Sequence, residues 1–288
     1  MAPTSRLPLT ATICTLDEEG NIAAILDILV RESIAEIVVV DGGSIDRTVE
    51  IARSYGAKVI NTGRLGLAHQ RRVAVENAGQ AAVALLDADH RPEPGALAKL
   101  LDELHEYGYD GIEAQIVSEH NVGYFDWAME ENFRLTHNFP GPRRMIGTPC
   151  VYRTEVLRQV NFDPFFTGPA DDTDLCYRLK KHGYVLGVGT AVVRQVHRSS
   201  FSGFLKKWFW YGKGDAQFVW KHPERLMSIL KHQLWTYPVA KSWLAVRVGS
   251  VRVVPFFVGA GLLRHYGMIW SLAVMVVRGA TDRNIYRT

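Results

Sequence analysis

Up to residue 90 the chain alternates between short runs of β-branched and aliphatic residues and longer segments with helical spacing. Short apolar runs are typical of buried parallel strands. Strands that alternate with helices indicate βαβ units and a mostly parallel sheet. The predicted strands cover residues 9–15, 36–40, 57–61 and 82–86, and the predicted helices cover residues 22–31, a segment from about 46, and residues 67–78.

Beyond residue 110 the pattern changes from this regular alternation. Further strands are predicted over 111–117, 145–152 and 185–196, and helices over 124–137 and 171–182. The helix at 171–182 has acidic residues in its first turn and basic ones in its last, as the helix dipole favours. The fold class is therefore α/β, with a mixed, mostly parallel sheet flanked by helices.

The C-terminal region has a different pattern from residue 201 onward. Residues 201–220 mix lysines with aromatic residues, and residues 251–277 are apolar but interrupted by Pro255, Arg264 and His265. Each apolar run is too short to cross a hydrocarbon core of roughly 30 Å, and central charges make a single span costly. We expect interfacial or re-entrant helices here.

Composition divides the chain in the same way. The net charge of +3 is too small to indicate nucleic acid as a partner, but the tail is basic while most carboxylates lie in the first half. This distribution favours an anionic partner or a membrane surface for the tail. We predict a catalytic domain over residues 1–200 and a basic, aromatic helical region over residues 201–288.

Three cysteines are widely separated and lack the spacing of a zinc site. They are typical of small core residues in a reducing compartment. Residues 1–8 have one positive charge and no apolar segment, unlike a secretory signal. We expect the catalytic part on the cytoplasmic face of the membrane.

Polar side chains follow three predicted strands at their carboxyl ends: Thr15, Asp41 and the motif Asp87-Ala88-Asp89. They should meet at one crevice, because parallel sheets bind ligands beyond these ends. Carboxylates at i and i+2 can share Mg²⁺ or Mn²⁺, which completes its shell with water and phosphate oxygens. The position predicts a metal-assisted nucleotide site, with a solvated acidic turn as the alternative.

The turn Asp41-Gly42-Gly43-Ser44 joins the second strand to the next helix. Its glycines allow the backbone to approach a ligand closely, and Asp41 can accept hydrogen bonds from a base or a ribose. Helix capping by Ser44 or Asp46 is an alternative explanation, and it is compatible with binding.

Three carboxylates, Asp171, Asp172 and Asp174, lie at the start of one predicted helix. Capping explains one or two of them. Crowded carboxylates raise one another's proton affinity, which suits a general base that deprotonates an acceptor hydroxyl. His197 follows the last predicted strand. A metal ligand and a packed histidine are both compatible with this position, and both interpretations stay open.

Together these motifs resemble the family-2 glycosyltransferases with the GT-A fold, a group that includes dolichyl-phosphate mannose synthase-like enzymes. The resemblance covers residues 9–198. Thr15-Leu16-Asp17-Glu18-Glu19 is similar to the family's PTYNEE-like segment, and Asp41-Gly42-Gly43-Ser44 to its DDGS-like turn. Gly66-Leu67-Ala68-His69-Gln70-Arg71 is similar to G-x-A-x-A-R-N, and Asp171-Asp172-x-Asp174-Leu175 to E-D-x-D-L.

The resemblance implies a GT-A (Rossmann-like) fold and a role for each matching residue. Asp41 is implied to contact the nucleobase, Asp172 to act as the base, and His197 to complete the metal shell of Asp87 and Asp89. The implied nucleotide-sugar contacts are Thr15, Leu16, Glu18, Asp41, Gly43, Arg71, Asp87, Ala88 and Asp89. Our candidates for acceptor or phosphate contacts are Asp171, Arg198, Lys206, Lys207 and Lys213.

These residues predict an inverting, metal-dependent glycosyltransferase that moves one sugar from a UDP- or GDP-sugar to a hydroxyl or phosphate acceptor, for instance a polyprenyl phosphate. No Q-x-x-R-W motif follows His197, which favours transfer of a single sugar over polymer synthesis. A nucleotidyltransferase is one alternative, but its basic Gly-rich loop is replaced by an acidic turn after the first strand. A catalytically inactive nucleotide-sugar-binding protein is the other, and intact Asp89 and Asp172 argue against it.

Overall fold

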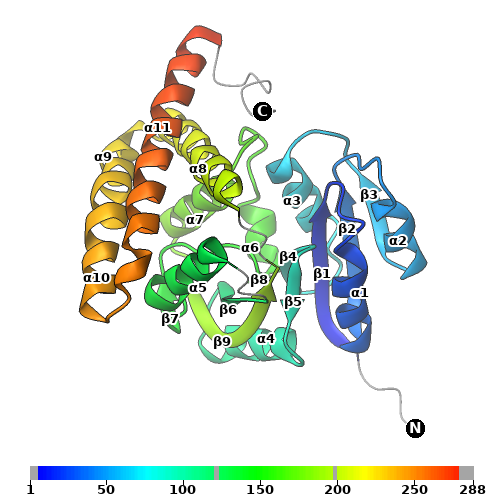
Figure 1. Ribbon diagram of the computed structural model, residues 1–288. Helices are drawn as coiled ribbons and strands as arrows, with labels where there is room; N and C mark the ends of the chain where they lie inside the picture. The colour runs from blue at the N-terminus through cyan, green and yellow to red at the C-terminus, as the bar shows by residue number, and fades with distance from the viewer. Residues whose placement is uncertain (1–5, 120–122, 197–199, 279–288) are drawn as a thin grey trace. The chain divides into compact units, whose positions relative to one another are not determined.

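The structure is a computed structural model that describes residues 6–119, 123–196 and 200–278 (Figure 1). Residue contacts divide the chain into two compact units. The first unit contains Met1–Glu119, Asn138–Pro164 and Asp172–Val196. The second contains His120–His137, Phe165–Asp171 and His197–Thr288, so it includes two internal segments besides the C-terminal region.

One mixed sheet organises the first unit, with nine strands among the described residues. The strand order is β3-β2-β1-β4-β8-β6-β9-β5, and β7 pairs with β9. Strands β1, β2, β3, β4, β6 and β9 run in one direction and the other three in the opposite one, which confirms a mostly parallel sheet. The strands are β1 (Leu7–Thr15), β2 (Ile34–Asp41), β3 (Lys58–Asn61), β4 (Ala82–Asp87), β5 (His90–Pro92), β6 (Gly111–Ser118), β7 (Gly141–Arg143), β8 (Cys150–Arg153) and β9 (Leu186–Gln195).

Helices cover both faces of this sheet, because successive strand residues point to opposite sides. In β4, Ala84 and Leu86 pack in a core with α1 and α4, whereas Val83 and Leu85 pack with α3, α6 and α7. Buried apolar layers on both faces are what a run of aliphatic strand residues favours. The helices of this unit are α1 (Ile22–Arg31), α2 (Thr48–Ser54), α3 (Leu67–Glu76), α4 (Ala96–Glu106), α6 (Thr154–Gln159) and α7 (Asp171–Lys181).

The regular elements described in the second unit are all helices, and the unit has its own core, which includes Trp208 and Phe256. Helices α8 and α11 pack closely, since a Cβ at Gly212 would clash with the carbonyl oxygen of Arg264, and one at Gly267 with that of Phe209. Only glycine permits this approach. The elements are α5 (Tyr124–Thr136), α8 (Phe201–Lys221), η1 (Pro223–Arg225), α9 (Leu226–Lys231), η2 (His232–Lys241), α10 (Ser242–Arg247), η3 (Val251–Val253) and α11 (Val254–Arg278).

Two predictions of local structure were wrong. Residues 145–149 do not continue a strand into β8, because the N–H groups of Ile146 and Gly147 donate to the side chains of Cys176 and Glu113. The tail residues 254–278 form one continuous helix instead of two short segments. Arg264 does not interrupt that helix, since Asp215 pairs with it on α8.

Among the described residues, one helix, spanning Val251–Arg278, is long and apolar enough to cross a membrane by length and composition. A third of its most apolar stretch is buried within the protein, which is less than in the core helix of a soluble protein. The helix is therefore consistent with membrane association without showing it.

Candidate active site

The register of the sheet brings the predicted polar residues to one edge of the first unit. Thr15 lies opposite Asp41 across the β1–β2 pair, and Cys14 lies opposite Asp87 across β1–β4. β5 then adds His90 opposite Gln195, the last residue of β9. The acidic turn after β4 is thus surrounded by the ends of parallel strands, where α/β sheets bind ligands.

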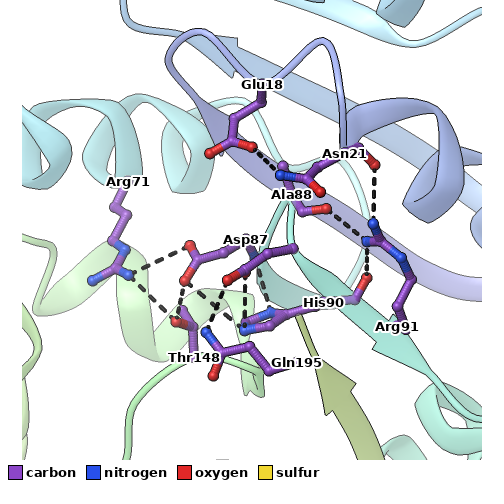
Figure 2. A network of polar contacts seen from close by, with 10 residues as sticks. Glu18, Asn21, Arg71, Asp87, Ala88, His90, Arg91, Thr148 and Gln195 are labelled. Carbon is purple, nitrogen blue, oxygen red and sulfur yellow. Dashed lines mark hydrogen bonds and ion pairs between the residues drawn. The ribbon is translucent and has the colours of Figure 1, made fainter. Parts of the chain in front are cut away.

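Asp87 is held by two neighbours at two different oxygens (Figure 2). The hydroxyl of Thr148 donates to Oδ2 over 2.8 Å, and Nη2 of Arg71 lies 3.7 Å from Oδ1. Burial raises the pKa of Asp87, but the neighbouring His90, the charge of Arg71 and the hydrogen bond from Thr148 outweigh burial and hold the pKa below its usual value. Asp87 is therefore ionised and oriented at neutral pH.

One carboxylate oxygen of Asp89 accepts a hydrogen bond, and the other accepts none from the described residues. Nε2 of Gln195 donates to its Oδ2 over 3.1 Å. Its Oδ1 is buried and has no hydrogen-bond partner among the described residues. Burying a carboxylate oxygen without a hydrogen-bond partner costs free energy. Oδ1 therefore has the properties of an oxygen ligand for a cation.

His90 lies below the acidic turn in Figure 2 and orients it through a hydrogen bond with the turn's backbone. The backbone N–H of Asp87 donates to its Nδ1 over 3.0 Å, which assigns the proton of the neutral ring to Nε2. Nε2 lies 4.0 Å from Asp87 and 3.9 Å from Asp89. Although the three side chains lie close enough to share an ion, an N–H group cannot ligate a metal, so the two carboxylates are the fitting ligands.

A third carboxylate, Glu18, borders the turn on the side of β1. Its oxygen accepts a hydrogen bond from Asn21, and Arg91 donates to the carbonyl oxygen of Ala88 (Figure 2). Burial raises the pKa of Glu18, and the nearby charges of Asp89 and Asp87 raise it further, while Asn21 opposes this. The site therefore concentrates negative charge that a cation would relieve.

Asp41 is fully buried in the turn that follows β2. Its Oδ2 accepts from the N–H groups of Gly43 and Ser44, and its Oδ1 accepts from the hydroxyls of Ser44 and Thr15. Gly43 has φ +89°, a conformation that favours glycine. Asp41 therefore shapes the turn, whereas Leu16 beside it is exposed.

The three carboxylates at the start of α7 have different surroundings. Asp174 is fully buried and pairs with Arg178 over 2.6 Å, and Asp171 is also buried. Asp172 is half-buried, and its Oδ2 would lie 3.4 Å from a Cβ at Gly147. Asp172 is thus the most accessible of the three, next to the residue that precedes Thr148.

The remaining predicted residues lie elsewhere. His197 and Arg198 lie outside the described residues. Lys206 is exposed on α8 in the second unit, and Lys207 is half-buried there. Lys213 is buried between the rings of Phe209 and Trp270, and burial lowers its pKa, so it is not part of an exposed cationic patch.

Sequence reasoning missed Thr148, His90, Gln195 and Asn21. His90 and Gln195 carried a weak signal, because each lies directly beside a predicted motif or strand end. Thr148 carried none: its contact with Asp87 joins residues 61 positions apart, and only the β4–β8 pairing brings its segment to the acidic turn.

A mixed α/β sheet with an acidic turn at its carboxyl edge is typical of nucleotide-binding enzymes. Residues 10–166, more than half of the chain, match the sequence family described as Glycosyl transferase family 2, and the chain belongs to that family. It is a glycosyltransferase with a GT-A fold.

Curated relatives agree with this assignment. Succinoglycan biosynthesis protein ExoA of Rhizobium meliloti is 28% identical over 286 residues, which cover 89% of this chain and 84% of that protein. Glycosyltransferase AglJ of Haloferax volcanii is 36% identical over 111 residues, which cover 37% of this chain and 36% of that protein.

Solved structures share the fold at low sequence identity. The mannosyltransferase PcManGT from Pyrobaculum calidifontis, in complex with GDP-Man and Mn²⁺, has a TM-score of 0.57 at 18% identity and covers 98% of this chain and 79% of its own. Glucosyl-3-phosphoglycerate synthase from Mycobacterium tuberculosis, with Mg²⁺ and UDP, has a TM-score of 0.56 at 15% identity, covering 73% and 78%. These likenesses establish the fold alone.

Proposed function

We propose that the chain transfers one sugar from a UDP- or GDP-sugar to an acceptor, with inversion at the anomeric carbon, and that Asp89 and Asp87 hold Mg²⁺ or Mn²⁺ for this reaction. The main support is Oδ1 of Asp89, which is buried and has no hydrogen-bond partner among the described residues. It faces a site with the carboxylates of Asp87 and Glu18 nearby. Oxygen ligands of this kind suit a hard cation.

A bound cation in such a site neutralises charge on a leaving nucleoside diphosphate. The chain's own residues supply the remaining functions. Asp172 takes the proton of an acceptor hydroxyl as that oxygen attacks the anomeric carbon. Arg71 and Thr148 keep Asp87 oriented, and Asn21 keeps Glu18 oriented. A single displacement needs no covalent intermediate on the enzyme.

The choice of donor is supported by proteins of the same fold. One is described with GDP-Man and Mn²⁺, and another with UDP and Mg²⁺. Thermal-shift screening of the full chain against UDP-, GDP- and dTDP-sugars, with and without Mn²⁺, tests this choice. We expect stabilisation by a UDP- or GDP-sugar that depends on the metal. Equal shifts without metal would contradict a metal-dependent site.

The role of Asp172 has its own test. Asp172→Asn should lower transfer by roughly 10²- to 10⁴-fold, because it removes the general base. The same variant should keep its metal-dependent thermal shift with the nucleotide-sugar. Asp102→Asn, on the exposed side of α4, is the matched control and should transfer at the wild-type rate. Equal loss of binding and turnover in Asp172→Asn would count against its role as base.

An acceptor at the cytoplasmic face of a membrane, for instance a hydroxyl of a lipid-linked molecule, completes the proposal. The structure buries Trp208 against Tyr237 and Phe256, so the expected interfacial aromatics of α8 are partly core residues. An exposed stripe on η2 and α10 takes their place. It consists of Trp235, Val239, Trp243 and Val246, whose spacing of three and four residues places them on one side.

The charge around this stripe suits anionic lipid. Residues 226–278 contain no aspartate or glutamate, and four of their six lysines and arginines are exposed: Lys231, Arg247, Arg252 and Arg278. Arg247 lies 4.6 Å over the ring of Trp243, an arrangement typical of a helix that lies in the membrane interface. All three cysteines are thiols, as in a reducing compartment.

Vesicle flotation tests this surface. The full chain should float with vesicles of phosphatidylglycerol and phosphatidylcholine more than with phosphatidylcholine alone. The double variant Trp235→Ser/Trp243→Ser should lose this flotation, while Trp220→Ser, which removes an exposed tryptophan of α8, should keep it. Unchanged flotation of the double variant would exclude the stripe as the docking surface.

A further inference from the structure

Thr148 has no assigned role, yet its hydroxyl lies between the two charged groups that flank the metal site. It donates to Oδ2 of Asp87 over 2.8 Å and lies 3.5 Å from Nη2 of Arg71, which donates to it. A hydroxyl has one donor and can accept from another group. Since Arg71 supplies the proton on one side, the hydroxyl proton of Thr148 is directed to Asp87.

The backbone on both sides of Thr148 is anchored to β6. Oε1 of the buried Glu113 accepts from the N–H of Gly147 over 3.0 Å. The N–H of Ala114 donates to the carbonyl oxygen of Pro149 over 3.0 Å. Two consecutive residues of one strand therefore clamp the residues before and after Thr148, and a β-branched side chain on such a backbone has few rotamers.

The same short segment reaches the acceptor side of the site. A Cβ at Gly147 would lie 3.4 Å from Oδ2 of Asp172 and 3.6 Å from Oε1 of Glu113. The open side of Gly147 thus faces the proposed base, while the next residue, Thr148, contacts the proposed metal carboxylate. This segment therefore sets the spacing between the proposed base, Asp172, and the proposed metal carboxylate, Asp87.

We infer that Thr148 is a positioning residue that fixes the carboxylate of Asp87 for the metal, and that Glu113 holds its segment in place. The inference rests on the proposed metal-dependent function. A carboxylate held from behind by a hydroxyl and a guanidinium keeps its orientation when the cation arrives. Such supporting contacts typically change metal affinity by roughly 10- to 100-fold when they are removed.

Two neighbouring substitutions should therefore produce two different defects. Thr148→Val keeps the shape of the side chain but removes the hydroxyl, so it should weaken Mn²⁺ binding roughly 10- to 100-fold. Gly147→Ala adds a methyl group at ordinary contact distance from Asp172. It should lower kcat while Mn²⁺ affinity stays near the wild-type value.

Mn²⁺ binding to the metal-free full chain, measured by electron paramagnetic resonance with and without UDP or GDP, is the direct test. Thr148→Ser retains the hydroxyl and should bind Mn²⁺ within a few-fold of wild type. Thr12→Val is the matched control, because it removes a buried threonine hydroxyl that bonds to the carbonyl oxygen of Ala84 in the sheet. Its Mn²⁺ affinity should not change.

Unfolding of each metal-free variant is measured in parallel, so that a folding defect is seen separately. Equal Mn²⁺ affinity in Thr148→Val and wild type would overturn the positioning role and leave the proposed function standing. A Thr148→Ser variant as weak as Thr148→Val would also overturn it. If the wild type binds no Mn²⁺ under any of these conditions, the proposed metal dependence fails and the inference fails with it.

Discussion

Asp215 in the second unit is buried and Asp89 in the first is partly exposed, and their partners also differ. Asp215 is 1% exposed, Arg264 pairs with both of its oxygens, and Gln233 donates a further hydrogen bond. Asp89 has Gln195 on one oxygen and no hydrogen bond on the other among the described residues. His90 near Asp89 presents its N–H at 3.9 Å, beyond hydrogen-bond distance.

The difference separates structural charge from charge kept for a ligand. The Asp215 network joins α8, η2 and α11, since His265 also contacts Gln233. Its charges are matched within the protein, so it has nothing left to bind. Asp89 lies beside Asp87 and Glu18, which carry the same sign of charge, and its Oδ1 has no hydrogen bond among the described residues. We take such an oxygen, next to like charges, as the mark of a ligand-binding carboxylate.

The largest effect on stability is expected from Asp215→Asn. It leaves Arg264 buried without its counter-charge, so the free energy of unfolding should fall by about 3–5 kcal/mol. Chemical denaturation followed by circular dichroism measures the change. The double variant Asp215→Leu/Arg264→Met replaces both charges with apolar groups and should recover most of the loss. A single variant as stable as wild type would contradict a structural role for the pair.

A smaller effect for each pH unit, at most about 1.4 kcal/mol, is expected from Lys241 in the second unit. Lys241 donates to Asn132 and lies over the ring of Tyr237, and burial, with the charge of Arg264, lowers its pKa from 10.5 to about 7. Between these pKa values the unfolded chain binds a proton that the folded chain lacks, so stability should rise with pH from about 7 toward 10.5.

Denaturation at several pH values measures this slope. Lys241→Met should flatten it, because the substitution removes the titrating group. Lys231→Met, at an exposed position of α9, should leave the slope unchanged. The same slope in Lys241→Met and wild type would exclude Lys241 as its source.

The smallest effect on stability is expected from Asp89→Asn in the absence of metal. The substitution removes one of several like charges, so the free energy of unfolding should stay within about 0.5 kcal/mol of wild type or increase. The comparison with Asp215→Asn is then direct, since both variants change a carboxylate to its amide. A loss as large as that of Asp215→Asn would show that Asp89 is a structural residue.

Local patterns were sufficient to predict the first half of the fold. The helix at Ile22–Arg31 and strands β1 to β4 lie where the predicted segments do, because apolar periodicity and turn residues specify such elements locally. The same reasoning predicted that Thr15, Asp41 and Asp87 meet at one edge, and the register of β1 with β2 and β4 confirms it.

Contacts between distant residues were not predictable in this way. Arg264 was interpreted as an obstacle within an apolar segment, because its partner Asp215 lies 49 residues away on another helix. The contact of Thr148 could not be predicted from the sequence either, because its partner Asp87 lies 61 residues away. Asp41 was assigned to the nucleobase from a resemblance, and only the structure shows that its own turn occupies its oxygens.

Release of UDP or GDP from a UDP- or GDP-sugar, measured against Mn²⁺ concentration in wild type and Asp89→Asn, tests the central claim most directly. The full chain should release nucleotide only when Mn²⁺ or Mg²⁺ is present. Asp89→Asn should lower this rate by roughly 10²- to 10³-fold, because it weakens the electrostatic stabilisation of the leaving group. A wild-type rate that survives metal chelation, or an Asp89→Asn variant with the wild-type response to Mn²⁺, would contradict a metal site at Asp89.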